Sequence, residues 1–292
     1  MAREETPFRR ILSDFLASPT AVFGLVLLTA ILVVAIAAPF ISPQNPYDLA
    51  QLDVMDGRLP PGAKTDGGTF WLGTDDQGRD MLSAIFYGLR ISLTVGVVST
   101  VVALALGLAL GLAAAYLGGR TETVIMRIAD IQLSFPAILI ALILLAVLGQ
   151  GMLKIIAALV TVQWAYYART VRSAALVEKR KEYIEAARCL ALPPSRIVFR
   201  HLLPNCLPPL IVVATVQVAA AIALEATLSF LGLGLPITEP SLGLLIANGY
   251  QYLLSGKYWI SFFPGVALLI TIVSINLVAD QLRDVLNPRL QR

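Results

Sequence analysis

Long stretches without a charged side chain constrain this sequence more than any other feature. No Asp, Glu, Lys or Arg occurs in residues 15–47, 91–119, 131–153, 155–168, 202–224 or 258–279. A helix needs about 20 mostly apolar residues to cross the hydrocarbon core of a bilayer, and five of the six stretches are long enough. With 57% hydrophobic and only 14% charged residues, the chain cannot cover a soluble globule with polar groups. The sequence therefore predicts an integral membrane protein.

The six stretches predict an all-α membrane fold with six spans. The fourth stretch has only 14 residues, but Lys154 and Arg169 at its ends can extend toward the two membrane surfaces. The predicted spans are residues 20–41, 90–117, 128–148, 152–172, 206–225 and 259–281. Residues 226–255 are also apolar but are interrupted by Pro236 and Pro240, which favours an interfacial or re-entrant segment; a seventh span is the alternative.

The distribution of Lys and Arg predicts the orientation in the membrane. Of the 22 basic residues, 16 fall in the N-terminal segment, the 118–130 loop, the 169–205 loop and the C-terminal segment. Cytoplasmic loops carry an excess of Lys and Arg, so both the N- and C-termini are expected in the cytoplasm. Segment 42–89, which holds seven Asp residues, is then extracytoplasmic.

Residues 1–19 are predicted to form a cytoplasmic amphipathic leader. Thr6 and Pro7 suit the start of a helix, and a helix lying on the inner leaflet is expected, with an unstructured polar leader as the alternative. The apolar residues of the leader share one helical face: Phe8, Ile11, Leu12, Phe15 and Leu16. The apolar run that follows is too long for a cleaved signal peptide and lacks a small-residue cleavage site, so it is expected to stay as the first span.

Catalytic and metal-binding motifs are missing from the sequence. It has one histidine, His201, and two cysteines, Cys189 and Cys206, which provide neither a zinc motif nor a catalytic dyad inside the membrane. It has no glycine-rich P-loop for a nucleotide. We therefore expect a protein that is not an enzyme and that binds no metal or cofactor of its own.

The basic 169–205 loop is the most informative polar segment. Residues 182–188 form a helix-favouring run, and Pro193 and Pro194 end it, because a residue before proline is driven out of the helical region. A second short helix is expected over about 194–202. This arrangement is either a rigid docking element for a partner or a solvated loop that only orients the protein.

The same loop resembles the EAA loop of ABC-importer permeases, the segment that docks into the ATPase subunit. The residues that carry this likeness to the coupling loop, about 173–205, are Tyr183, Glu185, Ala186, Ala187, Arg188, Ala191 and Pro204. Ala191 stands where the family usually has glycine. If the glycine adopts a left-handed turn, Ala191 costs about 1 kcal/mol; we expect the two prolines to redirect the chain instead.

A second motif resembles the dipeptide/oligopeptide/nickel permease family. It lies just before the second span and contains Gly73, Thr74, Asp75, Gly78, Arg79 and Asp80. Two further matches lie in 228–234 and 276–288, and the N-terminal extension with its own span resembles the "C"-type subunit of the permease pair. The motif residues could contact a solute-binding protein or hold the loop over the spans, and we expect the second.

The resemblance implies the type I ABC-importer permease fold in a bacterial inner membrane. It also implies a homologous permease subunit as heterodimer partner, two ABC ATPases that use ATP and Mg²⁺, an extracytoplasmic solute-binding protein, contact with membrane lipid and none with nucleic acid. The substrate is expected to be a short peptide; nickel chelates, opines and glutathione are alternatives. A passive channel or a membrane-embedded enzyme is the rival interpretation from another class. The expected units are residues 1–19, 20–41, 42–89, a permease core 90–282 and a cytoplasmic tail 283–292.

Four residues within the spans are candidates for the passage or its gate: Gln132, Pro136, Gln163 and Glu225. The two glutamines could equally make hydrogen bonds between helices, and Pro136 should kink the third span. Glu225 is an acid at the outer end of an apolar span, so it is either a gating residue or an interfacial carboxylate in contact with water or the outer loop.

Overall fold

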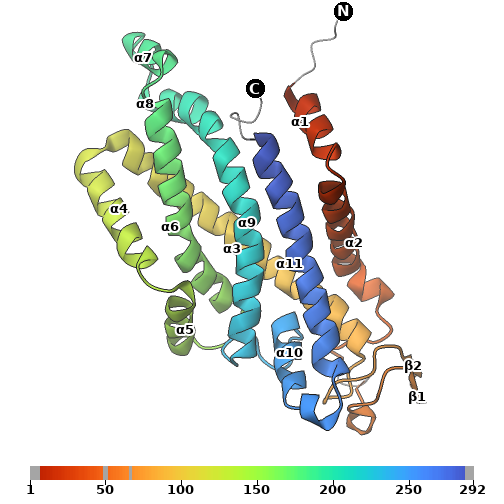
Figure 1. Cartoon of the computed structure of the whole chain (residues 1–292). Coiled ribbons are helices and arrows are strands. Elements are labelled where there is room, and N and C mark those ends of the chain that lie inside the picture. The colour runs from red at the N-terminus through yellow and green to blue at the C-terminus, as the bar shows by residue number, and fades with distance from the viewer. Residues whose placement is uncertain (1–6, 49–51, 66–67, 287–292) are drawn as a thin grey trace, which may run out of the picture.

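The computed structural model describes residues 7–48, 52–65 and 68–286, which are almost entirely helical (Figure 1). Its long helices are α2 (Pro19–Ile41), α3 (Met81–Leu117), α4 (Gly119–Leu133), α5 (Ala137–Leu148), α6 (Met152–Glu178), α9 (Leu203–Phe230) and α11 (Trp259–Leu286). Its shorter helices are α1 (Pro7–Leu16), η2 (Val54–Asp56), α7 (Glu182–Cys189), α8 (Pro194–Arg196), the π-helix η3 (Ile197–Leu202), α10 (Leu242–Tyr250) and η4 (Leu253–Ser255). Thr6 and residues 287–292 of the expected tail lie outside the described residues.

Four spans of the described chain are long and apolar enough to cross a membrane: α2, α3, the continuous run from Pro194 to Phe230, and α11. α6 has 27 residues, with Lys154 and Arg169 inside it. The expected span 128–148 is broken: α4 and α5 meet there at 92°, and together they are apolar enough to count as one broken span or a re-entrant segment. Pro136 lacks an amide hydrogen and forces the residue before it out of the helical region, so the chain breaks rather than kinks.

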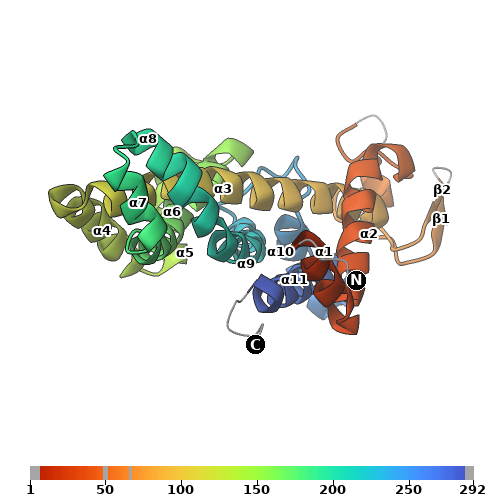
Figure 2. The same cartoon turned by 90° about the horizontal axis from the view of Figure 1, so that it is seen from above.

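α3 runs across the molecule, from α4 and α6 on one side to α2 on the other (Figure 2). Gly107 and Gly111 let α3 and α6 approach closely, because a Cβ added at Gly107 would lie 2.5 Å from the Cβ of Tyr167. A Cβ at Gly111 would lie 2.6 Å from the carbonyl oxygen of Ala168. Small residues drive helix packing in membranes in this way.

The second span begins earlier than its uncharged stretch suggests. The carboxylate of Asp80 accepts a hydrogen bond from the amide of Ser83 at 2.9 Å and so caps α3, which starts at Met81 rather than at residue 90. Arg90 therefore lies in the interior of a helix of 37 residues rather than at its start, and its side chain is exposed.

One end of the molecule carries the connection between α2 and α3 together with α10 (Figure 1). This connection contains the short antiparallel hairpin β1 (Ala63–Thr65) and β2 (Gly68–Phe70), in which Ala63 pairs with Phe70. The described residues form no other strand, so this part of the chain is all-α apart from the hairpin. α10 has nine residues, about 14 Å, and is too short to be a seventh span. The opposite end carries α1, α7 and α8.

Candidate functional site

α7 is a short helix with one face against its own chain and one face open. Ile184 and Ala187 are buried and pack with Ile197 and Leu202 of the following π-helix. The other residues assigned to the coupling loop on this helix are exposed: Tyr183, Glu185, Ala186 and Arg188. The small side chain of Ala187 therefore serves packing within the chain, and of the two alanines only Ala186 is open to a partner.

α7 ends in a left-handed residue at the position where the family resemblance leads one to expect glycine. Ala191 has φ of 51°. The amide of Leu192 donates to the carbonyl oxygen of Ala187 at 3.1 Å, and that of Ala191 to Arg188 at 2.9 Å, which is the Schellman pattern of helix ends. The expectation that Pro193 and Pro194 remove the need for a left-handed turn is wrong, because these bonds require it.

A hydrogen-bond chain holds α7 between α6 and α9. The hydroxyl of Tyr183 donates to Glu178 Oε2 at 2.6 Å and accepts from Asn205 Nδ2 at 3.2 Å, while Lys181 pairs with Glu178. Burial raises the pKa of Tyr183 to about 12, with help from the bond to Glu178. Burial alone would raise the pKa of Glu178, but the bonds from Lys181 and Tyr183 outweigh it and lower that pKa. Pro204, the second residue of α9, is exposed beside this chain.

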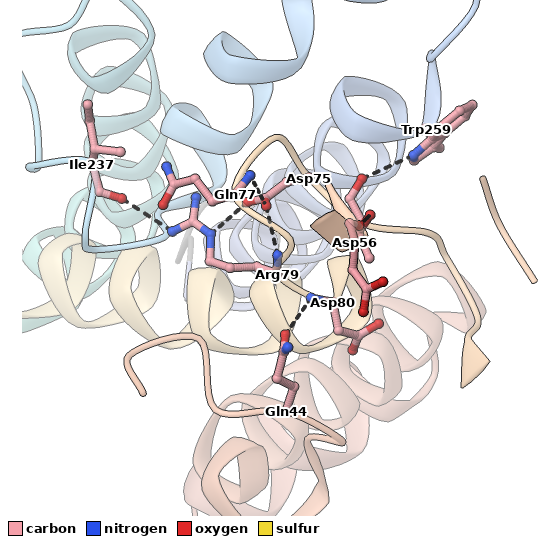
Figure 3. Close-up of polar contacts among 9 residues, drawn as sticks. Gln44, Asp56, Asp75, Gln77, Arg79, Asp80, Ile237 and Trp259 are labelled. Carbon is pink, nitrogen blue, oxygen red and sulfur yellow. Dashed lines mark hydrogen bonds and ion pairs between the residues drawn. The ribbon is translucent and has the colours of Figure 1, made fainter. Parts of the chain in front are cut away.

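The motif before α3 forms a buried cluster of polar side chains, the Asp75–Arg79 cluster (Figure 3). Arg79 and Asp75 form an ion pair with 1% and 0% of their side chains exposed, and Arg79 Nη1 also donates to the carbonyl oxygen of Ile237 at 3.2 Å. Asp75 Oδ1 accepts the amide hydrogens of Gln77 and Arg79. Because both charges face inward, the motif holds the loop over the spans, as expected, and does not present Asp75 or Arg79 to a partner.

Neighbouring residues connect this cluster to other elements. The hydroxyl of Thr74 donates to the carbonyl oxygen of Asp56, and its own carbonyl accepts from Trp259 Nε1 at 3.2 Å. The amide of Asp80 donates to Gln44 Oε1 at 2.6 Å. Gly73 and Gly78 have φ of 79° and 77°; a Cβ on Gly78 would lie 2.1 Å from the carbonyl oxygen of Asp53, so only glycine fits there.

The two candidate glutamines of the spans make bonds between helices. Gln132 Nε2 donates to the carbonyl oxygens of Thr161 and Val162 of α6, and Gln132 Oε1 accepts from Trp164 Nε1 at 2.6 Å. Gln163 is buried; its amide donates to the carbonyl oxygen of Gln217 at 3.2 Å and its oxygen accepts from the hydroxyl of Thr100. These contacts match the packing alternative. Pro136 lies apart from them, at the start of α5.

Of the two contacts expected for an interfacial Glu225, the one with water is wrong, because the residue is fully buried, whereas the one with the outer loop is found at Ser241. Its Oε2 accepts from the hydroxyl of Ser92 on α3 at 2.9 Å, and its Oε1 accepts from Ser229 at 2.7 Å. Ser241, which caps α10, also contributes a hydrogen bond. Glu225 thus joins three helices.

The predicted site residues form separate groups rather than one site. The α7 group lies at one end of the molecule and the Asp75–Arg79 cluster at the other. Gln132 joins α4 to α6, Gln163 joins α6 to α9, and Glu225 contacts the residue that caps α10. Sequence reasoning missed Ser229, although its spacing of four from Glu225 on a helix is a usable signal. It also missed Ser92, which is 133 residues away in sequence and gives no such signal. No group that could hold a metal ion occurs in the described part of the chain.

Comparison with known proteins gives matches over nearly the whole chain. Residues 103–292 match the model of the family "binding-protein-dependent transport system inner membrane component", and residues 6–61 match "N-terminal TM domain of oligopeptide transport permease C". A putative peptide transport system permease protein of Brucella suis is 41% identical over 92% of this chain and 87% of the relative. The dipeptide transport system permease protein of Escherichia coli K12 is 40% identical over 98% of this chain and 95% of the relative.

The fold also matches solved structures. A chain of the MetNI methionine ABC transporter, in an inward-facing conformation, aligns with a TM-score of 0.58 at 24% identity, over 71% of this chain and 98% of that chain. A second crystal form of that transporter gives a TM-score of 0.59 at 22% identity, with the same coverage.

Proposed function

Since the chain belongs to the family of inner membrane components of binding-protein-dependent transport systems, we propose that it carries di- and oligopeptides. It is a permease subunit of an ABC importer and a multi-pass inner membrane protein. The observation that carries the peptide assignment is the likeness to the dipeptide permeases of E. coli and Bacillus subtilis, which are 40% and 36% identical to it over 98% and 93% of this chain.

The proposed complex pairs this chain with a homologous permease, so that each provides half of the pathway. Two partner ATPases bind ATP and Mg²⁺ and hydrolyse the ATP, and this chain is not an enzyme and binds no cofactor. ATP drives transport in such a complex only if it binds one conformation more tightly than the other. A solute-binding protein delivers the peptide to the side that carries the 42–80 segment.

α7 is the proposed contact with the ATPase. It projects at one end of the molecule (Figure 1) and exposes Glu185 and Ala186 on a helix that Ile184 and Ala187 fix to the chain beneath. A helix anchored in this way moves together with α6 and α9, to which Tyr183 ties it. Closure of the ATPases can therefore be transmitted to two spans at once.

The excess of Lys and Arg supports a cytoplasmic position for this end. α1 and the last turn of α11 lie at the same end as α7 (Figure 1), which supports cytoplasmic N- and C-termini in a bacterial membrane. The buried Asp75–Arg79 cluster then lies on the extracytoplasmic side. Of the four passage candidates, Pro136 best suits a gating role, because the break between α4 and α5 leaves two short rigid segments beside α6.

Peptide uptake by cells lacking this gene and complemented with variants tests the proposal. Ala186→Glu places bulk and a charge in a close contact, where an unpaired buried charge costs several kcal/mol. It should abolish uptake of a radiolabelled dipeptide and release the ATPases on purification. Ala186→Ser, the matched control, adds a single oxygen at the same exposed position and should keep both.

The two parts of the proposal fail separately. If Ala186→Glu reaches the membrane, retains its ATPases and transports at the rate of Ala186→Ser, α7 is not the coupling contact. If the wild-type complex binds its ATPases but takes up no dipeptide or oligopeptide, the peptide assignment is wrong and the coupling role stands.

A further inference from the structure

A groove of about 370 Å³ lies between α2 and α3, which are neighbours in both views (Figures 1 and 2). Its floor is formed by Ala35 and Leu93, which are buried against each other's helices. The small side chain of Ala35 leaves a trough between its larger neighbours. The walls are apolar and exposed: Leu32, Ile36, Val97 and Val98.

One cation lines this otherwise apolar groove. Arg90 of α3 is exposed and makes no ion pair within the described ranges. The hydroxyl of Thr94, the polar neighbour, is engaged with the carbonyl oxygen of Arg90 at 2.7 Å. A charge on a lipid-facing surface is costly unless it is paired or reaches the headgroup region, so the groove lacks an anion.

The depth of the groove suits the leaflet on the side of the 42–80 segment. Leu32–Ile36 lie five to nine residues before the end of α2, and Arg90 lies nine residues after the start of α3. At about 1.5 Å per residue these positions are about 8–14 Å from the helix ends, within reach of a long side chain that extends to the headgroups.

Tyr47 packs against α3 close to this cation: its ring lies edge-on to that of Tyr87, with 5.4 Å between the centroids, and Tyr87 precedes Arg90 by three residues. Burial raises the pKa of the Tyr47 hydroxyl and the charge of Glu239 adds to this, while Arg90 is near enough to lower it. Tyrosine rings are enriched at the membrane interface, and the Tyr47–Tyr87 pair lies about one helical turn from Arg90 along α3, which agrees with an interfacial level for this cation. Glu239 acts on Tyr47 but forms no ion pair with Arg90 in the part of the chain that the structure covers.

We propose that this groove is a binding site for one phospholipid, with an acyl chain along the α2–α3 trough and the phosphate on Arg90. The guanidinium presents paired N–H donors that match two phosphate oxygens. A phospholipid supplies both missing parts in one molecule, an anion at the interface and an apolar chain below it. A helix of a partner subunit would fill the groove equally well only if it carried an acidic residue opposite Arg90, buried in the interface.

Photolabelling tests the site on the complete complex in nanodiscs. A phosphatidylglycerol probe with a diazirine on its acyl chain should label peptides that contain residues 32–36 and 93–98. Arg90→Gln should reduce this labelling about fivefold, which corresponds to about 1 kcal/mol for one basic residue at a lipid surface. Arg90→Lys should keep it within about twofold. Lys154→Gln, which removes an exposed cation outside the groove, should leave it unchanged.

Two further variants decide the remaining outcomes. Val97→Trp fills the trough and leaves the charge, so it should abolish the labelling even if Arg90→Gln fails to accumulate in the membrane. A photoreactive p-benzoylphenylalanine at Ile36 should form a lipid adduct. Labelling that is equal in Arg90→Gln and wild type, labelling that survives Val97→Trp, or an adduct between Ile36 and another subunit would each overturn the proposal.

Discussion

Replacing Ala191 by glycine should stabilise the end of α7. Ala191 holds φ of 51° in the Schellman turn, where an L-residue suffers a close approach of its Cβ to a carbonyl oxygen that costs about 1–2 kcal/mol. Glycine avoids that contact but loses more backbone entropy on folding, about 0.5–1 kcal/mol. The net gain for Ala191→Gly is therefore about 0.5–1 kcal/mol.

Replacing Ala186, five residues earlier, by glycine should instead destabilise α7. Ala186 is exposed in the interior of α7, where glycine costs about 1 kcal/mol relative to alanine. Since 1.4 kcal/mol is a factor of ten in an equilibrium, the local opening of α7 should differ by about ten- to twenty-fivefold between the two variants.

Hydrogen exchange of the α7 amides measures this difference. The amides of Leu190 and Leu192, which donate to Ala186 and Ala187, should exchange about two- to fivefold more slowly in Ala191→Gly than in wild type. They should exchange about fivefold faster in Ala186→Gly. Equal or faster exchange in Ala191→Gly would show that position 191 is not strained and that the left-handed turn is not what ends the helix.

Three other results are expected. A maleimide should modify Cys189, which is exposed, and spare Cys206, which is buried. A membrane-impermeant maleimide should reach Cys189 in inside-out vesicles only, and labelling of Cys189 in intact cells would reverse the orientation. Arg79→Leu should destabilise the outer loop by about 3–5 kcal/mol, because it leaves the Asp75 charge buried without a partner; an unchanged melting temperature of the purified complex would contradict this. The lowered pKa of Glu178 stabilises α7 above the unfolded pKa of 4.5, and that stability is lost as pH falls through the folded pKa. The raised pKa of Tyr183 stabilises α7 below pH 10, and that stability is lost as pH rises to about 12. Hydrogen exchange of the α7 amides, corrected for intrinsic rates, should therefore rise at both pH extremes, and less steeply in Tyr183→Phe.

The sequence by itself determined the membrane class, the family and most helix positions. Uncharged runs place α2 and α11 within a few residues, because a bilayer excludes charged groups whatever the neighbouring helices are. The helix over 182–189, its end before the two prolines and the second short helix also follow from local preferences. These features depend on the solvent and on near neighbours in the chain, both of which can be inferred from residue order.

Tertiary structure decided what each candidate residue contacts. Glu225 has the same sequence context whether it faces water or two serine hydroxyls, and only the packing of α3 on α9 brings Ser92 to it. The break at Pro136 depends on whether α4 finds a partner surface on α6, where Gln132 bonds to Trp164. Ala191 adopts the left-handed turn because Ile184 and Ala187 must face the π-helix. The contact of Glu225 with Ser92 and that of Gln132 with Trp164 join different helices, whereas the Ala191 turn depends on how two neighbouring helices pack; the free energy of such packing is not contained in a local sequence pattern.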